Sequence, residues 1–418
     1  MIGSNRSFGY DAAATFANFV ATPSLWDAFA VHSVLPTIPV KQVASNDHVL
    51  LSFLSHAIYS ATGSRSEVVY RLLPALAAGG TVALTTSALA QRFGMLAGFC
   101  AGLFIATDPL FVENSRDLRG YSLATFGAVL ATLILAGRWT RWRLVAYALA
   151  LGLAIATQLF VIVVLLAHAS WIATRRSWPQ LRQLAPAWVA AAAIGVAANA
   201  NIQLMEFLQH GYPAGVFYPT FPRDLVLFLV GAPVLLTVGL WLSTAGLGLW
   251  RLRAEPWLWA ASLTAAVAVA VLWLGLRPAY LYPRFFIFLV PACALLMAAA
   301  IARWKVLAVV VAAGSVVAAW SQVALYSEDP LALPQAAAAV ERIRASGGRA
   351  CVIHSDEQIL AAYTNDFAVV STPDQLAACD AVVVVSWGID LSLRDVAARE
   401  FPRATALHAY YPAVVLER

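Results

Sequence analysis

Charged side chains are scarce in this sequence. They make up 12% of its 418 residues, whereas 61% are hydrophobic. A soluble globular protein usually carries about 25% charged residues. Stretches such as 184–204 and 257–276 contain no charge at all, and a membrane-spanning helix needs about 20 mainly apolar residues. The scarcity excludes a chain that folds entirely in water and predicts one that crosses a membrane several times.

Other common signatures are also missing. The four cysteines form no CxxC pair and no other metal-binding spacing. No basic stripe with interleaved aromatics occurs, which excludes nucleic-acid binding. The start of the chain lacks the basic and apolar parts of a signal peptide. The net charge of +5 comes from short clusters between apolar runs, where membrane topology explains it.

Hydropathy predicts ten membrane spans, with boundaries that are soft by a few residues. The spans are 71–92, 95–111, 122–137, 143–157, 158–174, 184–204, 225–249, 257–276, 285–302 and 305–326. The run 142–174 is too long for one helix, so we divide it near Gln158. The fold class predicted from this pattern is a polytopic α-helical membrane protein.

The connections between these spans separate into two sets by charge. One set is basic throughout: Arg92; Arg138, Arg141 and Arg143; Arg175, Arg176 and Arg182; Arg251 and Arg253; Arg303 and Lys305. The positive-inside rule places this set in the cytoplasm. The other set would then lie at the outer face of a bacterial cytoplasmic membrane: residues 1–70, 112–121, 205–224, 277–284 and 327–418.

The first 70 residues are thus expected outside the membrane. The segment 46–63 is apolar but short, and counting it as a span would invert every later connection. We interpret it as a helix along the outer surface, with shorter interfacial helices at 11–20 and 24–35. Because an outside N-terminus normally needs a preceding span, we expect a first transmembrane helix upstream of Met1.

The composition changes after Tyr326. LPQAAAAVERIRASGG predicts a helix ending at Gly347-Gly348. RACVIHS, FAVVS, DAVVVVSW and ATALHAY predict strands, with helices at 356–363 and 391–400. A transmembrane domain at 1–326 is therefore expected to precede a small periplasmic α/β domain at 327–418. A disulfide between Cys351 and Cys379 can form there only if this domain lies outside the cytoplasm.

Side chains able to carry chemistry gather on the predicted outer face. The acids are Asp11, Asp47, Glu113 and Asp117, and the arginines are Arg71, Arg116, Arg119 and Arg284. Arginine there opposes the charge bias, and a guanidinium can bind phosphate through two hydrogen bonds. Each residue also has a structural explanation: the acids can cap helices, and the arginines can pair with nearby acids or lipid headgroups.

The histidines give weaker signals. His32, His56 and His168 stand alone in apolar surroundings, which is typical of packing residues. His354 and Asp356 stand two residues apart at the end of a predicted strand, with no third partner evident.

Five short motifs follow one another in the chain. They are Asp11 in GYDAAAT, Asn46-Asp47-His48-Val49-Leu50, RLLPALAAG at 71–79, SRDLRGYSL at 115–123 and PRFFIFLVP at 283–291. In this order they resemble the GT-C superfamily of membrane glycosyltransferases, in the branch of the protein O-mannosyltransferases and the lipid A aminoarabinose transferases. The chain departs from that pattern at Ala12, where the family has a second acid, and at Val49, where it has proline.

The resemblance implies transfer of a sugar from a polyprenyl-phosphate donor to a hydroxyl of a glycan, lipid or protein acceptor. It makes Asp11 the candidate base, because a carboxylate can accept the proton of an acceptor hydroxyl. The leaving lipid phosphate needs charge stabilisation, which Arg119 and Arg284 or a divalent cation can supply. The other candidate substrate-binding residues are Asp47, His48, Arg71, Asp117 and Tyr121. This hypothesis requires Asp11, Arg119 and Arg284 to meet, although they are far apart in the sequence.

Two other functions compete with this one. A transporter or flippase for lipid-linked sugars would carry ionisable residues deep in its spans, or broken helices in paired repeats. The predicted spans carry few, with Gln158 and Asn199 as the main polar side chains. A non-catalytic envelope assembly or binding protein is favoured by the missing second acid at Ala12.

Overall fold

The computed structural model divides the chain into two compact units. One comprises Met1–Asp47, Ser52–Tyr70 and Val323–Arg418, and the other comprises His48–Leu51 and Arg71–Gln322. The described residues are 10–29, 48–174, 178–210, 219–230, 235–276, 281–326, 332–354, 357–364, 366–385, 391–407 and 414–418. We refer to these as the N/C unit and the bundle unit. The domain boundary at residue 326 stays a prediction.

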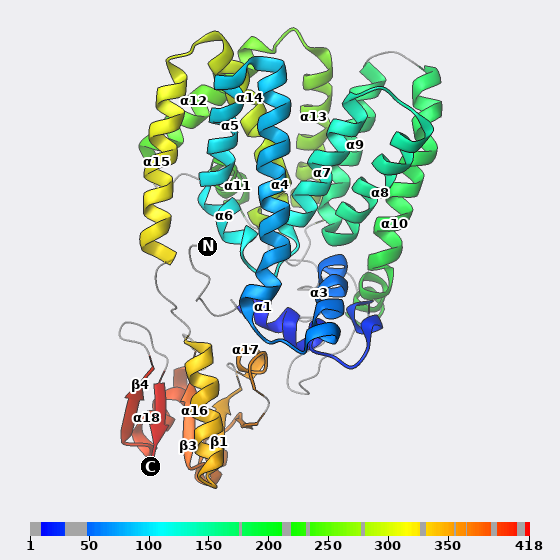
Figure 1. Ribbon diagram of the computed structural model, residues 1–418. Coiled ribbons are helices and arrows are strands. Elements are labelled where there is room, and N and C mark those ends of the chain that lie inside the picture. Colours follow the sequence, from blue (N-terminus) through cyan, green and yellow to red (C-terminus); the bar gives the residue numbers. More distant parts are fainter. Residues whose placement is uncertain are drawn as a thin grey trace. The chain divides into compact units, whose positions relative to one another are not determined.

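The bundle unit is helical (Figure 1). Its elements are α4 (Glu67–Phe93), α5 (Met95–Thr107), α6 (Pro109–Ser115), α7 (Tyr121–Ala136), α8 (Arg141–Thr157), η3 (Leu159–Val161), α9 (Ile162–Thr174), α10 (Trp178–His210), α11 (Phe221–Val230), α12 (Leu235–Arg251), α13 (Pro256–Ala270), η4 (Val271–Leu276), η5 (Pro283–Leu289), α14 (Val290–Arg303) and α15 (Leu307–Tyr326). Most predicted spans correspond to one of these elements. The expected polytopic helical architecture is therefore present.

The predicted number of spans is not confirmed. Among the described residues, four helices are long and apolar enough to cross a membrane: Glu67–Phe93, Trp178–Ala200, Pro256–Gly275 and Pro283–Arg303. A fifth span results if α5 and α6, which meet at 62°, are counted together. Other apolar helices offer shorter stretches of 10–17 residues, such as Tyr121–Ala136 and the part Leu307–Trp320 of α15. The count of ten came from hydropathy alone, which does not detect where a helix breaks.

Two predicted spans are interrupted. The span at 95–111 breaks at Asp108, whose carboxylate Oδ1 accepts a hydrogen bond of 2.7 Å from the N–H of Phe111 and so begins α6. The span at 225–249 is replaced by α11 and α12. The predicted division near Gln158 is confirmed, because Gln158 has extended backbone angles (φ −147°, ψ 107°) between α8 and η3.

A buried polar network connects four helices of the bundle unit and corrects the interpretation of His168 as an isolated packing residue. Its Nδ1 lies 3.0 Å from the hydroxyl of Tyr147, and its Nε2 lies 3.0 Å from the hydroxyl of Thr132. The Thr132 hydroxyl donates to the carbonyl of Ala128, and the indole N–H of Trp188 donates to Tyr147. Buried polar groups normally need such partners, so the network helps to align α7, α8, α9 and α10.

The N/C unit joins the start and the end of the chain. Its first part contains α1 (Tyr10–Thr15), η1 (Phe16–Val20), η2 (Leu25–Phe29) and most of α3 (Val49–Thr62). α1 with η1 and α3 coincide with the short helices predicted at 11–20 and 46–63. The first half of the segment predicted at 24–35 contains the 3-10 helix η2, and its second half lies outside the described residues. The ring of Phe16 packs edge-on against Tyr59 and Tyr70, with centroids 5.8 and 5.0 Å away.

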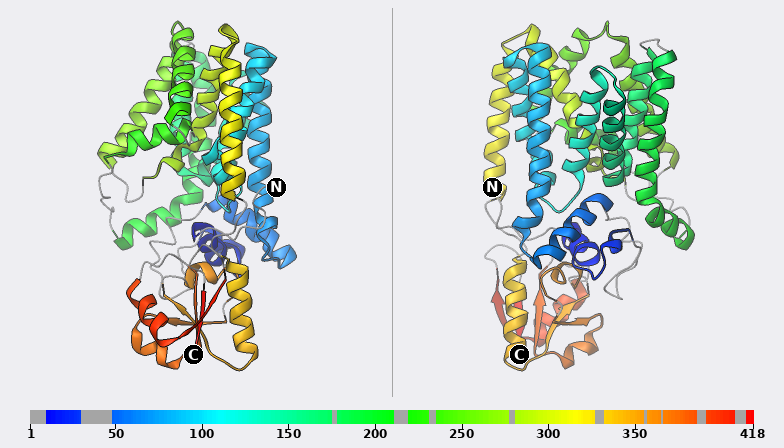
Figure 2. Two further views of the ribbon diagram at one scale, coloured as in Figure 1. Left: turned by 90° about the vertical axis from the view of Figure 1, so that its left-hand side faces the viewer. Right: turned by 45° about the vertical axis from the view of Figure 1, so that its right-hand side comes forward.

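The C-terminal part of the N/C unit is a five-stranded mixed sheet with helices on both faces (Figure 2). Its elements are α16 (Leu333–Ala345), β1 (Ala350–Ile353), α17 (Glu357–Leu360), β2 (Ala368–Val370), η6 (Pro373–Ala378), β3 (Ala381–Val384), α18 (Leu391–Glu400), β4 (Arg403–Ala406) and β5 (Val414–Glu417). The strand order is β2-β1-β3-β5-β4, in which β1 pairs in parallel with β2 and β3, and β5 runs antiparallel to β3 and β4. The predicted α/β domain is thus present, although β5 was not predicted.

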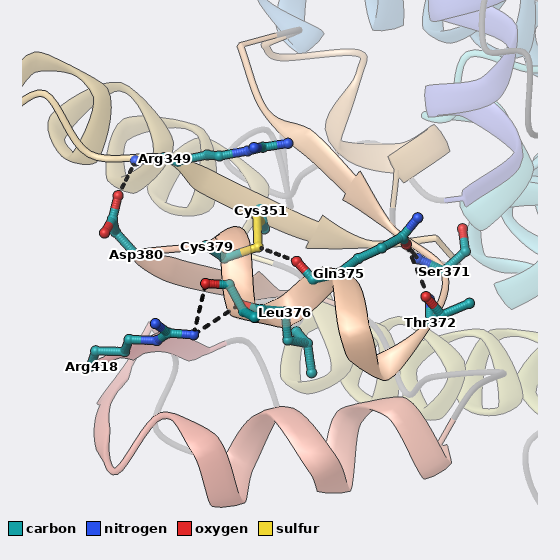
Figure 3. Close-up of a disulfide and its surroundings, with 10 residues drawn as sticks. Arg349, Cys351, Ser371, Thr372, Gln375, Leu376, Cys379, Asp380 and Arg418 are labelled. Atoms are coloured by element: carbon teal, nitrogen blue, oxygen red, sulfur yellow. Dashed lines mark hydrogen bonds between the residues drawn. A yellow bond between two sulfur atoms is a disulfide. The ribbon is translucent and has the colours of Figure 1, made fainter.

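A disulfide joins β1 to the end of η6 in this domain (Figure 3). It pairs Cys351 with Cys379, whose Cα atoms are 5.9 Å apart, which settles the pairing that the sequence left open. Two hydrogen bonds lie beside the disulfide. The N–H of Arg349 donates to Asp380 at 2.7 Å, and the guanidinium of Arg418 donates to the carbonyl of Leu376 at 3.1 Å. On the other side of the unit, α17 packs against α1.

Candidate functional site

His48 is the point where three segments of the bundle unit meet. Its side chain is buried, and Nδ1 lies 3.0 Å from the carbonyl oxygen of Thr157, the last residue of α8. A carbonyl can only accept, so Nδ1 carries the hydrogen and donates it. The last carbonyls of a helix have no partner within the helix, and His48 satisfies one of them. Its Nε2 is then a hydrogen-bond acceptor, and it is buried without a partner among the described residues.

Gly120 allows the loop before α7 to approach His48. A Cβ atom at this position would lie 3.0 Å from both the Cβ and the Nδ1 of His48, and closer still to the Cγ2 of Thr157. Any residue larger than glycine would therefore push the loop away from the histidine. This close contact gives a physical reason for the glycine in the motif SRDLRGYSL.

Arg119 and Tyr121 flank that glycine and are both buried. The ring of Tyr121 meets the ring of His48 at an angle of 75°, with centroids 4.8 Å apart. Nη2 of Arg119 donates to the hydroxyl of Tyr121 at 3.4 Å, and its guanidinium carbon lies 5.6 Å from the centre of the tyrosine ring. A cation is thus held in the interior, next to the histidine.

A stack of aromatic rings positions Arg284 in the same region. The neighbouring residue in η5, Phe285, stacks on Phe160 with centroids 5.3 Å apart and on Tyr121 with centroids 6.3 Å apart. The guanidinium carbon of Arg284 lies 5.0 Å from the centre of the Tyr282 ring. Stacked pairs of this kind stabilise by about 0.5–1.5 kcal/mol beyond their area burial. The stack fastens η5 against α7, and so it brings Arg284 towards Arg119 despite their separation in sequence.

The charges of this cluster act on His48. Burial lowers the pKa of His48 well below its usual range, and the positive charge of Arg119 lowers it further. The hydrogen bond to Thr157 raises the pKa, and the charge of Arg284 lowers it by a smaller amount. His48 is therefore neutral at physiological pH. The charges of both guanidinium groups reach His48, so an anion bound beside it would be attracted to both. Phosphate matches their hydrogen-bonding geometry.

The other candidate residues lie around this cluster or apart from it. Arg71 is buried on α4, one turn before Pro74, whose carbonyl accepts a hydrogen bond of 2.9 Å from Ser122 of α7. Asp117 is half-buried in the loop before α7, where its Oδ1 accepts a hydrogen bond of 3.0 Å from the N–H of Leu118. Both therefore lie close to the segment that carries Arg119.

The remaining two candidates, Asp11 and Asp47, belong to the N/C unit. Asp11 is the second residue of α1, within the helix rather than before it, and belongs to the N/C unit. Its convergence with Arg119 and Arg284 stays a prediction. Asp47 lies outside the described residues. The structure thus brings together His48, Arg119 and Tyr121 with Arg284.

Sequence reasoning missed several contributors. Thr157 contributes its backbone carbonyl to the site, and a backbone group cannot be predicted from the residue type. Phe160 and Phe285 act through ring stacking between distant segments, which hydropathy does not reveal. Asp108 did have a signal, because it is an acid inside a predicted span. It is fully buried, and its Oδ2 has no hydrogen-bond partner in the parts of the chain that the structure describes. The statement that the spans carry few ionisable side chains therefore omitted this carboxylate.

No metal site can be assembled from the described residues. Within the ranges given above, no three His, Cys, Asp or Glu side chains lie close enough together to hold a metal ion. The divalent cation that the resemblance allowed therefore has no group of three such ligands among the described residues.

Solved structures with a similar fold were found by comparison with known proteins. No protein-family model matches the chain, and no curated protein sequence matches it. Among solved structures, it is similar to ArnT from Cupriavidus metallidurans in the apo state, with a TM-score of 0.61 and 13% identity, over 99% of this chain and 94% of that one. The same enzyme bound to undecaprenyl phosphate matches with a TM-score of 0.57 and 13% identity, over 97% of this chain and 95% of that one.

A second protein shares the architecture. The Archaeoglobus fulgidus oligosaccharyltransferase, crystallised in complex with Zn and sulfate, matches with a TM-score of 0.50 and 14% identity, over 93% of this chain and 65% of that one. Both neighbours are GT-C glycosyltransferases, so the resemblance drawn from the five motifs is confirmed at the level of the fold. Identities this low establish the fold alone.

Proposed function

We propose that this chain transfers a sugar from a polyprenyl-phosphate donor to a hydroxyl of a glycan, lipid or protein acceptor, at the outer face of the cytoplasmic membrane. The observation that carries the proposal is the pair of guanidinium groups, Arg119 and Arg284, acting on one neutral buried histidine. This cluster occurs in a fold that ArnT also has, and ArnT has been crystallised with undecaprenyl phosphate. A lipid phosphate close to both arginines would be stabilised by their charges.

The chemistry requires one base and one anion-stabilising group. The acceptor oxygen forms a bond to the anomeric carbon while the bond from that carbon to the phosphate oxygen breaks. The lipid phosphate leaves with the electron pair, and Arg119 and Arg284 stabilise its charge. The acceptor proton passes to a carboxylate, for which Asp11 is our candidate. A single displacement of this kind inverts the configuration at the anomeric carbon.

Neutral His48 has a supporting role in this scheme. Its Nδ1–H is committed to the carbonyl of Thr157, so Nε2 can only accept a hydrogen bond. A group with so low a pKa is a poor proton acceptor for catalysis near neutral pH. We therefore assign His48 to positioning of a substrate hydroxyl together with Tyr121, and not to proton transfer. Asp47, Arg71 and Asp117 remain proposed substrate-binding residues.

The proposed orientation rests on charge and on the disulfide. The basic connections point to the cytoplasm by the positive-inside rule. Cytosolic thiols are normally kept reduced, so the Cys351–Cys379 bond supports a periplasmic position for the C-terminal domain.

Binding of undecaprenyl phosphate to the purified full chain tests the proposal. Native mass spectrometry in detergent would give the affinity of the wild type and of Arg119→Gln and Arg284→Gln. Each variant should bind at least about tenfold more weakly, because each loses a charged hydrogen bond worth about 1.5–3 kcal/mol. Arg138→Gln, which removes an exposed charge between α7 and α8, is the matched control and should bind normally.

Turnover separates an enzyme from a binding protein. Asp11→Asn should leave undecaprenyl phosphate binding unchanged and prevent consumption of the lipid-linked donor, measured in lipid extracts of a deletion strain carrying each variant. If Asp11→Asn restores donor consumption fully, Asp11 is not the base. If neither arginine variant changes binding, the cluster is structural and the proposed function is wrong.

A further inference from the structure

A second group of cations lies at one end of the bundle unit, apart from His48 and its neighbours. The connections that follow α12 and α14 lie side by side there (Figure 1). This is shown by the rings of Trp250 and Trp304, which stack with centroids 5.9 Å apart and planes 28° apart. Arg251 and Arg303 are the last residues of the two helices, and Arg253 and Lys305 lie in the connections that follow.

Some of the cations at this end are already engaged in the fold. Arg92 at the end of α4 lies 3.9 Å from the carboxylate of Glu255. Arg251 donates to the carbonyl of Ala299 on α14, and its guanidinium carbon lies 5.8 Å from the centre of the Phe93 ring. These two arginines have partners that account for their positions.

The other three cations have no acidic partner among the residues that the structure describes. Within the described parts of the chain, no carboxylate lies within 4.0 Å of the charged nitrogens of Arg253, Arg303 or Lys305. All three are exposed. We name this group, together with Trp250 and Trp304, the cationic corner.

Aromatic and apolar surface surrounds these charges. The guanidinium carbon of Arg253 lies 4.3 Å from the centre of the Trp250 ring, which is the closest cation–ring contact described for this chain. Trp259 fixes the same connection by donating its indole N–H to the carbonyl of Arg253 at 2.9 Å. Trp250 is 55% exposed and Val306 is 69% exposed. Cations bordered by exposed apolar side chains suit a ligand that is itself amphipathic.

We propose that the cationic corner binds the phosphate of an anionic phospholipid headgroup, with Arg253, Arg303 and Lys305 around the phosphate and Trp250 and Trp304 beside the glycerol and upper acyl chains. Tryptophan rings favour the interface between headgroups and hydrocarbon, and basic side chains at a membrane surface attract anionic lipids. A free phosphate ion would gain nothing from the exposed rings and Val306, so the lipid is the ligand that fits both parts of the surface. This site does not depend on the proposed function.

Lipid retention by the full chain tests the site. The protein is reconstituted in an equimolar mixture of phosphatidylcholine and phosphatidylglycerol, and the lipids kept after detergent extraction are counted by native mass spectrometry. The wild type should retain phosphatidylglycerol over phosphatidylcholine. The triple variant Arg253→Gln/Arg303→Gln/Lys305→Gln should lower this preference by at least about fivefold, the effect expected of one basic residue near an anionic surface.

A matched variant distinguishes a site from diffuse attraction. Arg138→Gln/Arg141→Gln/Arg143→Gln removes the same number of exposed charges from the connection between α7 and α8. No cation–ring contact is described for these three arginines, so the triple variant should leave the preference nearly unchanged. Equal losses in both triple variants would overturn the proposal, because positive charge alone would then explain retention.

Two further arms complete the test. Trp250→Leu keeps every charge but removes the ring under Arg253, and it should also lower the preference for phosphatidylglycerol. Gel filtration and far-UV circular dichroism would establish that the variants remain folded. Inorganic phosphate added at the concentration of the lipid should not displace phosphatidylglycerol. If phosphate displaces it, or if Trp250→Leu has no effect on the preference, the corner is a general anion site and the lipid assignment is wrong.

Discussion

The bundle unit and the C-terminal sheet differ most clearly in what they expose. On the bundle, large apolar side chains face outward, among them Leu76, Leu263 and Val309, which are 63%, 66% and 69% exposed. In the described residues of 332–418, no large hydrophobic side chain is exposed to a comparable extent. Leu, Val and Phe side chains there fill the sheet core between β1, β3 and α18. The same residue types therefore face outward in one region and inward in the other, as a lipid-facing and a water-facing structure require.

The two regions are also stabilised by different kinds of interaction. Helices surrounded by lipid gain little from the hydrophobic effect when they associate, so close backbone contact becomes important. Gly248 of α12 fits directly against the backbone of Leu296 on α14, where any Cβ would collide. The C-terminal domain instead combines a small hydrophobic core with a covalent bond between Cys351 and Cys379. Small domains often need such a bond because their cores are limited.

Removal of the disulfide should have the largest effect of the changes considered, and it should destabilise the C-terminal domain without affecting the bundle. In the double variant Cys351→Ala/Cys379→Ala, the C-terminal domain should lose about 2–4 kcal/mol of stability, because the bond restricts the unfolded chain. Its cysteines are 28 residues apart in sequence. Hydrogen exchange measured by mass spectrometry on the full chain should show faster exchange in β1 and β3 but unchanged exchange in α4 and α14.

The free cysteines of the bundle provide the control for this measurement. Cys293→Ala alters a half-buried side chain of α14 and should leave exchange in the sheet unchanged. If the double variant instead loosens the bundle as much as the sheet, the two regions are not independently stabilised.

The positions of the elements could largely be predicted from sequence, because they depend on local pattern. Hydropathy located most helices, and the end of α16 shortly before Gly347 followed from its sequence. Gly347 has a φ of +83°, a left-handed conformation that glycine adopts readily. The order of the strands could not be predicted, because pairing of β3 with β5 joins residues far apart in the chain. Neither could the short strand β5 itself, which has few residues and no clear alternation.

The candidate site shows the same limit. Arg119 and Tyr121 were predicted together because they are neighbours in one motif. The contact between His48 and Thr157 uses a backbone carbonyl, so no residue type could indicate it. The position of Arg284 depends on ring stacking between η3, η5 and α7. Motif order indicated that these residues belong together, but only packing explains how they meet.

Two glycines of α12 test the role of close helix contact in the bundle. Gly248→Ala should destabilise the bundle by about 1–3 kcal/mol, the usual cost of overpacking, because the new methyl would meet the backbone of α14. Gly246→Ala, half a turn away, is the control: a Cβ there meets nothing within 4 Å. SDS titration followed by far-UV circular dichroism would give both values. Equal effects of the two substitutions would show that contact with α14 does not limit the bundle.

The smallest expected effect concerns a buried acid in the water-facing region. Glu357, at the start of α17, is fully buried, and its carboxylate lies 3.3 Å from Nδ1 of His354, whose side chain is 46% exposed. This contact also provides the third partner that the sequence did not reveal for His354. Burial raises the pKa of Glu357, and the charge of His354 partly offsets the rise.

A raised folded-state pKa means that the folded domain holds this proton more tightly than the unfolded chain does. The resulting stability is fully present below the unfolded pKa of about 4.3 and is lost as pH rises through the folded pKa. The C-terminal domain should therefore become less stable between mildly acidic and neutral pH, by about 1.4 kcal/mol for each unit of pKa difference.

Glu357→Gln keeps the shape without the charge, so it should flatten this dependence and stabilise the domain at neutral pH. Glu341→Gln, on the exposed side of α16, should change neither the pH dependence nor the stability at neutral pH. Hydrogen exchange of β1 and α17, corrected for the intrinsic effect of pH on exchange, would measure the difference. An unchanged pH dependence in Glu357→Gln would mean that His354 and Glu357 form an ion pair that fully offsets the cost of burial.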